Sequence, residues 1–261
     1  MFVLKNVCAS FKFIKTRPAS YSYIPESKIP EILKRFNLGI IPAAEKFDLD
    51  ETKQTICYSC GDVSTSKNDD LYIKTIAEAI KQDTIKRPVN LLVRTSPAEE
   101  PTRFMHLKEE YPFIKWNCPK WKLTRDGHQE TWSQRIPTIE DITDLKSVLA
   151  YTDISINMCS TMSLDAMFCD KPVINPVFGN KENGLYDDQR FLKFQHYKRV
   201  AESGAVAIVK DGVSLINEIN SSMQNPNKRL EAQKQLLDLQ ISHPLKNTGK
   251  RIATIIKECI K

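Results

Sequence analysis

The stretch that decides the fold is NMCSTMSLDAMFCDKPVINP, residues 157–176. It follows TDISI, which is short, β-branched and apolar, as a buried strand should be. Ser160 or Thr161 is placed to cap a helix, and Asp165 would lie in the first turn of that helix, where a carboxylate suits the positive end of the dipole. KPVINP, at the end of the stretch, is typical of the next strand. The pattern predicts a strand, a turn that bears hydroxyl groups, a helix and a second strand.

Strands and helices also alternate on both sides of this stretch. Residues 55–59 (TICYS) predict a strand, residues 69–82 a helix, and residues 87–94 (RPVNLLVR) a second strand. Residues 205–209 (AVAIV) predict a further strand between two helices. Such alternation predicts an α/β, Rossmann-like fold, in which helices cover both faces of a parallel sheet.

Two regions lack this alternation. Residues 1–53 contain several prolines and only short helical signals, so we expect an irregular lead or linker. Residues 117–138 contain two tryptophans without a clear period and predict a loop. The expected Rossmann-like domain therefore spans residues 54–261.

Composition narrows the class of protein. Of the 261 residues, 41% are hydrophobic and 27% charged, which suits a soluble globular protein with a real core. The net charge of +6 is spread along the chain and no known nucleic-acid-binding motif is present, so nucleic acid is not an expected partner. No apolar run is long enough for a membrane span, and no secretory signal is recognisable. We expect a cytoplasmic protein, with a peripheral position at the inner face of the membrane as the alternative.

The seven cysteines favour reduced thiols in such a compartment. Cys57 and Cys60 form a C-x-x-C, but no second ligand pair accompanies them. We interpret them as buried structural thiols and expect no metal site.

Polar residues follow three of the predicted strands. In an open parallel sheet, ligands bind beyond the carboxyl ends of the strands, so Gly61, Arg94, Ser160 and Thr161 should lie around one crevice. Each has a structural alternative: Gly61 could simply turn the chain, Arg94 could reach water along its stem, and the hydroxyls could only cap a helix. The sequence lacks G-x-G-x-x-G and G-x-x-x-x-G-K-[ST], which argues against nicotinamide dehydrogenases and P-loop enzymes.

The stretch TDISINMCSTMSLDAMFCDKPVI resembles the nucleotide-sugar signature of GT-B glycosyltransferases, in particular bacterial surface-polysaccharide enzymes and the related glycerophosphotransferases. ICYSCGDVSTSKNDDLYIKTIAEAI is similar to the first strand, turn and helix of the same domain, and NLLVRTSP to its second strand. The resemblance begins near Gln54, continues to the last residue, and implies the C-terminal, donor-binding half of the GT-B fold.

The resemblance also implies roles. Gly61 would lie by the donor phosphates, Arg94 would face the crevice, Ser160 and Thr161 would bind the diphosphate, and Asp165 would hold the ribose. The chain would transfer a sugar from a nucleotide-diphosphate sugar to a glycan or lipid-linked acceptor, without a required cofactor. The acidic position is usually Glu in that family and is Asp165 here.

GT-B enzymes have a second, N-terminal Rossmann-like domain that binds the acceptor and usually carries the catalytic base. The irregular first 53 residues do not supply one, so the catalytic residue is unassigned and a complementary domain or subunit is an expected partner. Two alternatives stay open: a non-catalytic nucleotide-binding module, and a sugar-nucleotide epimerase of the same fold.

Overall fold

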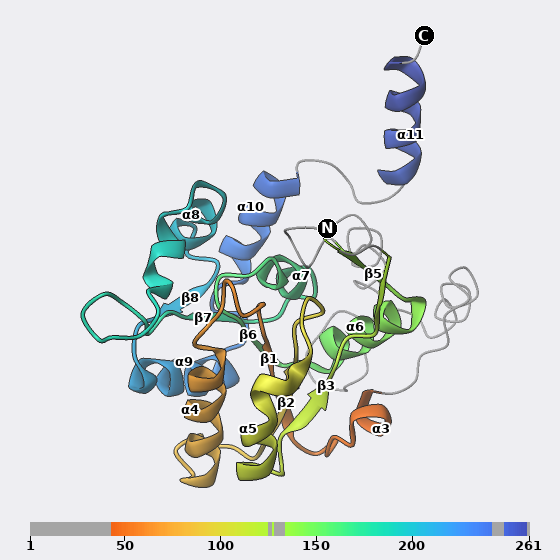
Figure 1. Cartoon of the computed structure of the whole chain (residues 1–261). Helices are drawn as coiled ribbons and strands as arrows, with labels where there is room; N and C mark the ends of the chain where they lie inside the picture. Colours follow the sequence, from red (N-terminus) through yellow and green to blue (C-terminus); the bar gives the residue numbers. More distant parts are fainter. Residues whose placement is uncertain (1–42, 125–126, 128–133, 242–247, 260–261) are drawn as a thin grey trace.

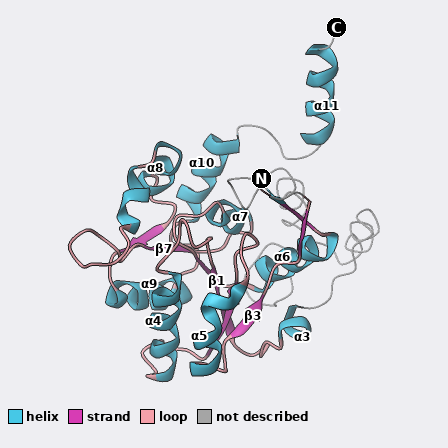
Figure 2. Ribbon diagram, viewed as in Figure 1, coloured by secondary structure: helices cyan, strands magenta, loops and turns pink. Residues whose placement is uncertain are grey.

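The computed structural model describes residues 43–124, 127, 134–241 and 248–259. Their centre is a six-stranded, entirely parallel sheet with the strand order β3-β2-β1-β6-β7-β8. Figure 2 shows these strands in the middle of the molecule with helices around them. The strands are β1 (Gln54–Ser59), β2 (Val89–Arg94), β3 (Lys115–Asn117), β6 (Ile154–Ile156), β7 (Val173–Pro176) and β8 (Ala207–Val209).

Helices cover both faces of the sheet, which confirms the predicted Rossmann-like fold (Figure 1). One face packs against α4 (Asp69–Lys81), α5 (Met105–Glu110) and α9 (Gly212–Gln224). The other face packs against α3 (Ala43–Phe47), α6 (Ile139–Tyr151), α7 (Met162–Phe168), α8 (Gln195–Glu202) and α10 (Leu230–Ile241). Two short 3-10 helices, η2 (Pro101–Phe104) and η4 (Asp188–Lys193), and the terminal helix α11 (Thr248–Cys259) complete these elements.

Side-chain alternation explains why β1 is buried on both faces. Ile56 and Tyr58, both fully buried, pack toward α4, whereas Cys57 packs toward α3 and α6. Successive residues of a strand point to opposite faces, and β-branched and aromatic residues suit a strand covered on both sides. The apolar runs that predict strands are therefore continuous rather than alternating.

The strand order reverses between β1 and β6. From β1 the chain moves outward to β2 and β3, and then returns to pair β6 with the other side of β1. Open α/β sheets bind ligands at such a reversal, beyond the carboxyl ends of the two strands. The loops after β1 and β6 begin at this edge, so the topology places two of the three predicted ligand-binding turns there.

Three regions differ from the sequence-based predictions. Within residues 117–138, β4 (Trp121–Leu123) and β5 (Arg135–Pro137) form an antiparallel pair, and strands of three residues are too short to show a period. The end of the expected irregular lead contains α3, where Phe47 packs into the core; residues 1–42 lie outside the described part of the chain. The single helix expected before the strand at residues 205–209 is divided into η4 and α8, because Phe194 between them has an extended backbone.

Among the helices that the structure describes, none is both long enough and apolar enough to cross a bilayer.

Candidate functional site

The loop after β1 is held in shape by one buried carboxylate, that of Asp69 at the start of α4. The Tyr58 hydroxyl donates to it at 2.6 Å and the Gly61 amide at 2.9 Å, and the Ser66 hydroxyl donates as well. Arg103 adds a hydrogen bond at 3.2 Å and also donates to the carbonyl oxygens of Gly61 and Ser66. Burial raises the pKa of Asp69 to about 7, against the lowering effect of these donors. Asp69 thus fixes the backbone of the loop.

Gly61 allows two parts of this loop to pack closely against each other. A Cβ atom at this position would lie 2.6 Å from Cβ of Ser66, too close for a side chain. The Gly61 amide points to Asp69, so it is already used inside the protein. The close approach that Gly61 permits in this structure is between two parts of the same loop.

The turn after β6 carries the two predicted hydroxyl groups. The side-chain oxygen of Asn157 accepts hydrogen bonds from the Ser160 amide at 2.9 Å and the Ser163 hydroxyl at 3.0 Å. The N-cap of α7 is Thr161, one of the two predicted positions, whereas Oγ of Ser160 accepts from the amide of Met162, the first residue of the helix, at 3.3 Å. Thr161 is exposed and its side chain makes no capping hydrogen bond. Its hydroxyl is therefore the more accessible of the two at this edge of the sheet.

A buried polar network lies behind this turn. The Tyr197 hydroxyl donates to Oδ1 of Asn175 at 2.6 Å and lies 3.2 Å from Oγ of Ser163. Nδ2 of Asn175 donates to the carbonyl oxygen of Asn157 at 2.7 Å. Since all four residues are buried, these bonds are shielded from water and join β6, α7, β7 and α8. The network fixes the position of the turn that carries Ser160 and Thr161.

The structure corrects the expected placement of Arg94. Its Nη2 donates to both carboxylate oxygens of Asp141, at 3.0 and 2.9 Å, and Nη1 donates to Asn117. Arg94 is only 6% exposed, so its guanidinium does not face an open crevice. The anion that this arginine meets at the end of an apolar strand is a carboxylate of the same chain. Arg94 therefore has a structural role that links β2 to the start of α6.

Asp165 lies in the first turn of α7, where the sequence predicted it. The residue is 9% exposed, so only a small part of it is open to a ligand from the surface. A ribose could therefore contact Asp165 only at the edge of the hydrophobic core, whereas the side chain of Thr161 is exposed at the surface.

Two cations that the sequence analysis missed lie near the same edge. The ammonium of Lys67, in the loop after β1, is 4.9 Å from the centre of the Tyr186 ring. The guanidinium of Arg190, in η4, is 4.4 Å from that ring. Both side chains are exposed, and no ion pair joins either of them to a carboxylate among the described residues. Lys67 follows β1 and Arg190 follows β7. This position after a strand is the only feature of the sequence that could have indicated them as ligand-binding residues.

The segment that carries Tyr186 is bound closely to the start of α4. Nδ2 of Asn68 donates to the Tyr186 carbonyl oxygen at 2.8 Å and to Asp188 at 2.9 Å, and the Tyr72 hydroxyl also donates to Asp188. A Cβ atom at Gly179 would overlap the Tyr186 carbonyl oxygen and lie 2.6 Å from Nδ2 of Asn68. Only glycine lets these two segments meet.

The turn after β6 lies close to the same segment. Burial, together with the negative charge of Asp188, raises the pKa of the Cys159 thiol to about 12. Cys159 precedes Ser160 and packs, like Tyr186, against the hydrophobic cluster under α4. The loop after β1, the turn after β6 and the segment after β7 therefore follow neighbouring strands at the carboxyl edge of the sheet.

Cys57 and Cys60 point away from one another. Cys57 packs in the cluster between the sheet and α3, and Cys60 packs in the cluster under α4. A separation of three residues along an extended chain gives opposite faces, so the two sulfur atoms cannot bind one ion together. Within the described residues, no group of three His, Cys, Asp or Glu side chains is arranged to hold a metal.

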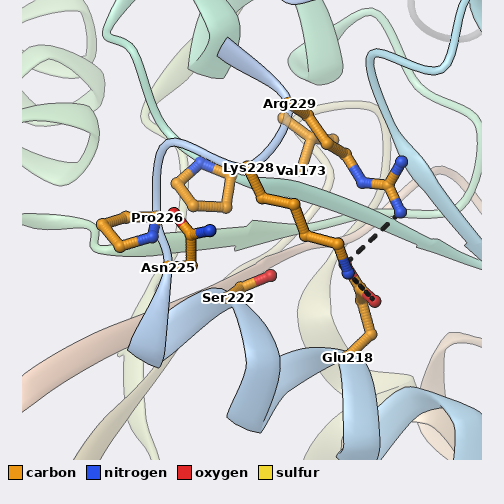
Figure 3. A pocket seen from close by; sticks show the side chains of 8 residues that line it. Val173, Glu218, Ser222, Asn225, Pro226, Lys228 and Arg229 are labelled. Carbon is orange, nitrogen blue, oxygen red and sulfur yellow. Dashed lines mark hydrogen bonds and ion pairs between the residues drawn. The ribbon is translucent and has the colours of Figure 1, made fainter.

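A small hollow lies at the opposite edge of the sheet. Figure 3 shows Val173, at the amino end of β7, with Glu218, Lys228 and Arg229 around it. Glu218 pairs with Lys228 at 3.4 Å and with Arg229 at 3.5 Å. One carboxylate thus pairs with two cations at the amino end of β7, and the hollow does not belong to the candidate site.

No protein-family model and no curated protein matches this sequence. Many solved structures match this fold, and three of them are described here. A glycosyltransferase from Rickettsia africae is 15% identical with a TM-score of 0.49, over 97% of this chain and 55% of that one. WaaG, a glycosyltransferase of lipopolysaccharide biosynthesis, is 14% identical with a TM-score of 0.45, over 90% of this chain and 52% of WaaG.

The third is the C-terminal domain of the group 1 glycosyl transferase LpcC from Francisella tularensis. It is 13% identical with a TM-score of 0.43, over 78% of this chain and 92% of that domain. The chain thus spans about half the length of WaaG and most of the LpcC domain. At this level of identity the similarity concerns the fold alone.

Proposed function

We propose that this chain is the donor-binding half of a glycosyltransferase that uses a nucleotide-diphosphate sugar in the synthesis of a cell-surface polysaccharide. The observation that carries the proposal is the meeting of three polar segments where the strand order reverses between β1 and β6. Two exposed cations, Lys67 and Arg190, and the hydroxyl of Thr161 lie on these segments. A nucleoside diphosphate, which is an anion with several acceptor oxygens, fits such a set of donors.

In this proposal Lys67 and Arg190 replace Arg94 as the cations that face the diphosphate. Both cations lie over the ring of Tyr186, so this one side chain holds them near each other although they come from distant parts of the chain. Ser160 and Thr161 bind diphosphate oxygens, and Asp165 contacts the ribose. Gly61 acts indirectly, through the shape of the loop after β1.

The chemistry expected of this site is stabilisation of the departing diphosphate. When the bond between sugar and phosphate breaks, negative charge grows on the leaving oxygen, and fixed cations nearby lower the energy of that state. The acceptor is a glycan or a lipid-linked sugar. The base that removes the acceptor's proton comes from a complementary N-terminal domain or subunit, because a second protein surface facing the donor site is needed to position both substrates.

The proposal is tested by measuring nucleotide affinity calorimetrically for UDP, CDP, GDP and ADP and for the matching monophosphates. We expect at least one diphosphate to bind, more tightly than its monophosphate. Replacing Lys67 or Arg190 by Gln should weaken that binding by about 1.5–3 kcal/mol, the range for a charged hydrogen-bond partner. Lys193→Gln, at an exposed position of the same η4, is the matched control.

A second pair of variants tests the turn after β6. Thr161→Ala should weaken binding without loss of stability, because the hydroxyl is exposed and makes no capping bond. Ser160→Ala should weaken binding and also remove about 1 kcal/mol of stability, because the amide of Met162 loses its hydrogen-bond acceptor. Diphosphate affinities that are unchanged in all four site variants would refute the assignment.

A non-catalytic nucleotide-binding module is the second candidate. It is favoured by the hydrogen bonds of the buried carboxylate of Asp69 at this edge, which already accepts from Tyr58, Gly61 and Ser66 and so is not free to act as a base. The two functions differ in turnover. Release of free nucleotide from a nucleotide-sugar in the presence of an acceptor and of the complementary subunit would identify the transferase.

A further inference from the structure

A row of aromatic rings leads from the candidate site to the start of α8. The Arg190 guanidinium lies over the ring of Tyr186, at 4.4 Å, and over that of Phe191, at 4.9 Å. The centres of the Phe191 and Phe194 rings are 5.0 Å apart, and the Phe194 ring is 5.8 Å from that of His196. Each member of the row contacts the next, and the row begins at a cation of the proposed diphosphate site.

The far end of the row is open to solvent. Phe194 is 39% exposed, and His196 and Arg199 of α8 are exposed as well. His196 and Arg199 are three residues apart, so they lie about 60° apart around the helix and share one side of it. In the part of the chain that the structure describes, no ion pair joins Arg199 to a carboxylate. An aromatic ring and an unpaired guanidinium thus lie on either side of His196.

The charge of this segment indicates the kind of ligand. Residues 189–199, QRFLKFQHYKR, contain four Lys or Arg and no Asp or Glu, so their surface attracts anions. The face of an aromatic ring is negative and attracts groups with partial positive charge, such as the C–H groups on one face of a sugar ring. An acidic sugar has both features: a ring that stacks and a carboxylate or phosphate that pairs with arginine.

Other occupants fit this surface less well. The helix α8 has no apolar face to enter a lipid bilayer, because its exposed residues are Gln195, His196, Lys198, Arg199 and Glu202. A second copy of the same segment would bring like charges together, which opposes association. Single-stranded nucleic acid stacks its successive bases on several rings, whereas Phe194 is the one exposed Phe or Tyr ring of this row.

We propose that Phe194, His196 and Arg199 form a subsite for an acidic glycan, which is the acceptor or the product chain of the proposed transferase. A sugar ring stacks on Phe194, and Arg199 binds a carboxylate or phosphate of the same chain. The contacts through Phe191 and Arg190 join this subsite to the diphosphate site, so a chain bound here has one end near the leaving group. The identity of the ligand rests on the proposed function, but the three residues are separate from those that bind the nucleotide.

The test is calorimetric titration of the whole chain with oligosaccharides. Hexagalacturonate and a hexamer of sialic acid, which are acidic, should bind, and salt should weaken their binding. Maltohexaose, which is neutral, should bind at least about tenfold more weakly, because it cannot pair with a guanidinium. Inorganic polyphosphate has charge but no sugar ring, so any binding of it should be the same in the parent protein and in Phe194→Leu.

Two variants separate the contributions of the ring and of the charge. Phe194→Leu keeps an apolar side chain and should weaken binding of the acidic oligosaccharides about tenfold, through loss of the stacking ring. Arg199→Gln should also weaken it about tenfold, through loss of a charged hydrogen-bond donor. Lys198→Gln is the matched control, because Lys198 lies on the other side of α8, where it pairs with Glu202 at 3.8 Å. The control should bind like the parent, and circular dichroism checks that all variants fold.

Unchanged affinity for the acidic oligosaccharides in both Phe194→Leu and Arg199→Gln would overturn the proposal, as would an absence of binding by both oligosaccharides in the parent. Equal binding of maltohexaose would exclude an acidic ligand. Polyphosphate binding that falls in Phe194→Leu as much as oligosaccharide binding does would mean a general surface for anions. Diphosphate affinity should be the same in all three variants, and Lys67→Gln should keep its affinity for glycan, so the two proposals can fail separately.

Discussion

Nη2 of Arg94 donates to both carboxylate oxygens of Asp141, at 3.0 and 2.9 Å, in the interior of the protein. The Trp121 indole also donates to this carboxylate, at 2.7 Å. The pair therefore connects the carboxyl end of β2, the start of α6 and the small antiparallel sheet. Its charges are removed from water, so loss of one partner leaves the other uncompensated.

We expect Arg94→Met to lower the free energy of unfolding by about 3–5 kcal/mol, the range for a broken buried ion pair. Urea unfolding measures this directly. The double variant Arg94→Met/Asp141→Leu should recover part of the loss, because no buried charge is then left alone. A variant at Arg94 that lost nucleotide affinity at unchanged stability would instead restore this residue to the ligand site.

Gly179→Ala should lower the free energy of unfolding. The added methyl group would overlap the Tyr186 carbonyl oxygen and crowd Nδ2 of Asn68. Overpacking of this kind costs about 1–3 kcal/mol, and movement of Tyr186 should also weaken diphosphate binding. Gly212→Ala is the matched control, because Gly212 begins α9 and its nearest neighbour would be a methyl group of Thr75 at 3.2 Å. Similar losses in the two variants would show that backbone freedom, rather than the close contact, is the cause.

Tyr197→Phe removes a hydroxyl from the network behind the turn after β6. Oδ1 of Asn175 would lose its donor in a buried place, which costs about 1–3 kcal/mol. Thermal or urea unfolding gives the loss. Replacing Asn175 by Leu in the same chain should cost less than the sum of the two single changes, because the partners act together. Additive losses would show that the two residues do not interact.

Asp69 should make the stability of the protein depend on pH. Its pKa is about 7 in the folded protein against 3.8 for an ordinary aspartate, so between these values the native state holds a proton that the unfolded chain has lost. The free energy of unfolding contributed by Asp69 is therefore greatest below about pH 4 and falls as the pH rises through 7.

The measurement is urea unfolding of the parent and of Asp69→Asn across this range. The parent should lose stability relative to the variant as the pH rises from about 4 to 7, and the difference should be constant above it. Asp238→Asn, on the exposed side of α10, is the control. A parent that instead gains stability relative to Asp69→Asn as the pH rises would mean that the four donors outweigh burial.

The sequence predicts the sheet well because each long strand is marked by its own short run of apolar, often β-branched residues. β-branched runs such as ISI before Asn157 mark buried strands, and the helix expected over 69–82 is observed at Asp69–Lys81. Three-residue strands and the interruption at Phe194 give no such local signal.

The site was predicted only in part, because its decisive contacts join distant residues. Ser160 lies in its predicted turn, but the partner of Arg94 is 47 residues away in the sequence and no periodicity indicates it. Likewise, Asn68 and Tyr186, which bring Lys67 toward Arg190, are 118 residues apart. The sequence indicates which edge of the sheet is polar, whereas the pairing of charges at that edge depends on the tertiary fold.

The anchoring of the loop after β1 has a thermodynamic consequence. Asp69 and Arg103 hold the loop at Gly61 and Ser66 through both amide and carbonyl groups. Ordering a backbone residue costs about 1–2 kcal/mol in conformational entropy, and here folding has already met that cost. A ligand that arrives at this edge meets a surface with little freedom left to lose. Association should then resemble the docking of a rigid body, with a rate set by diffusion and charge rather than by rearrangement of the loop.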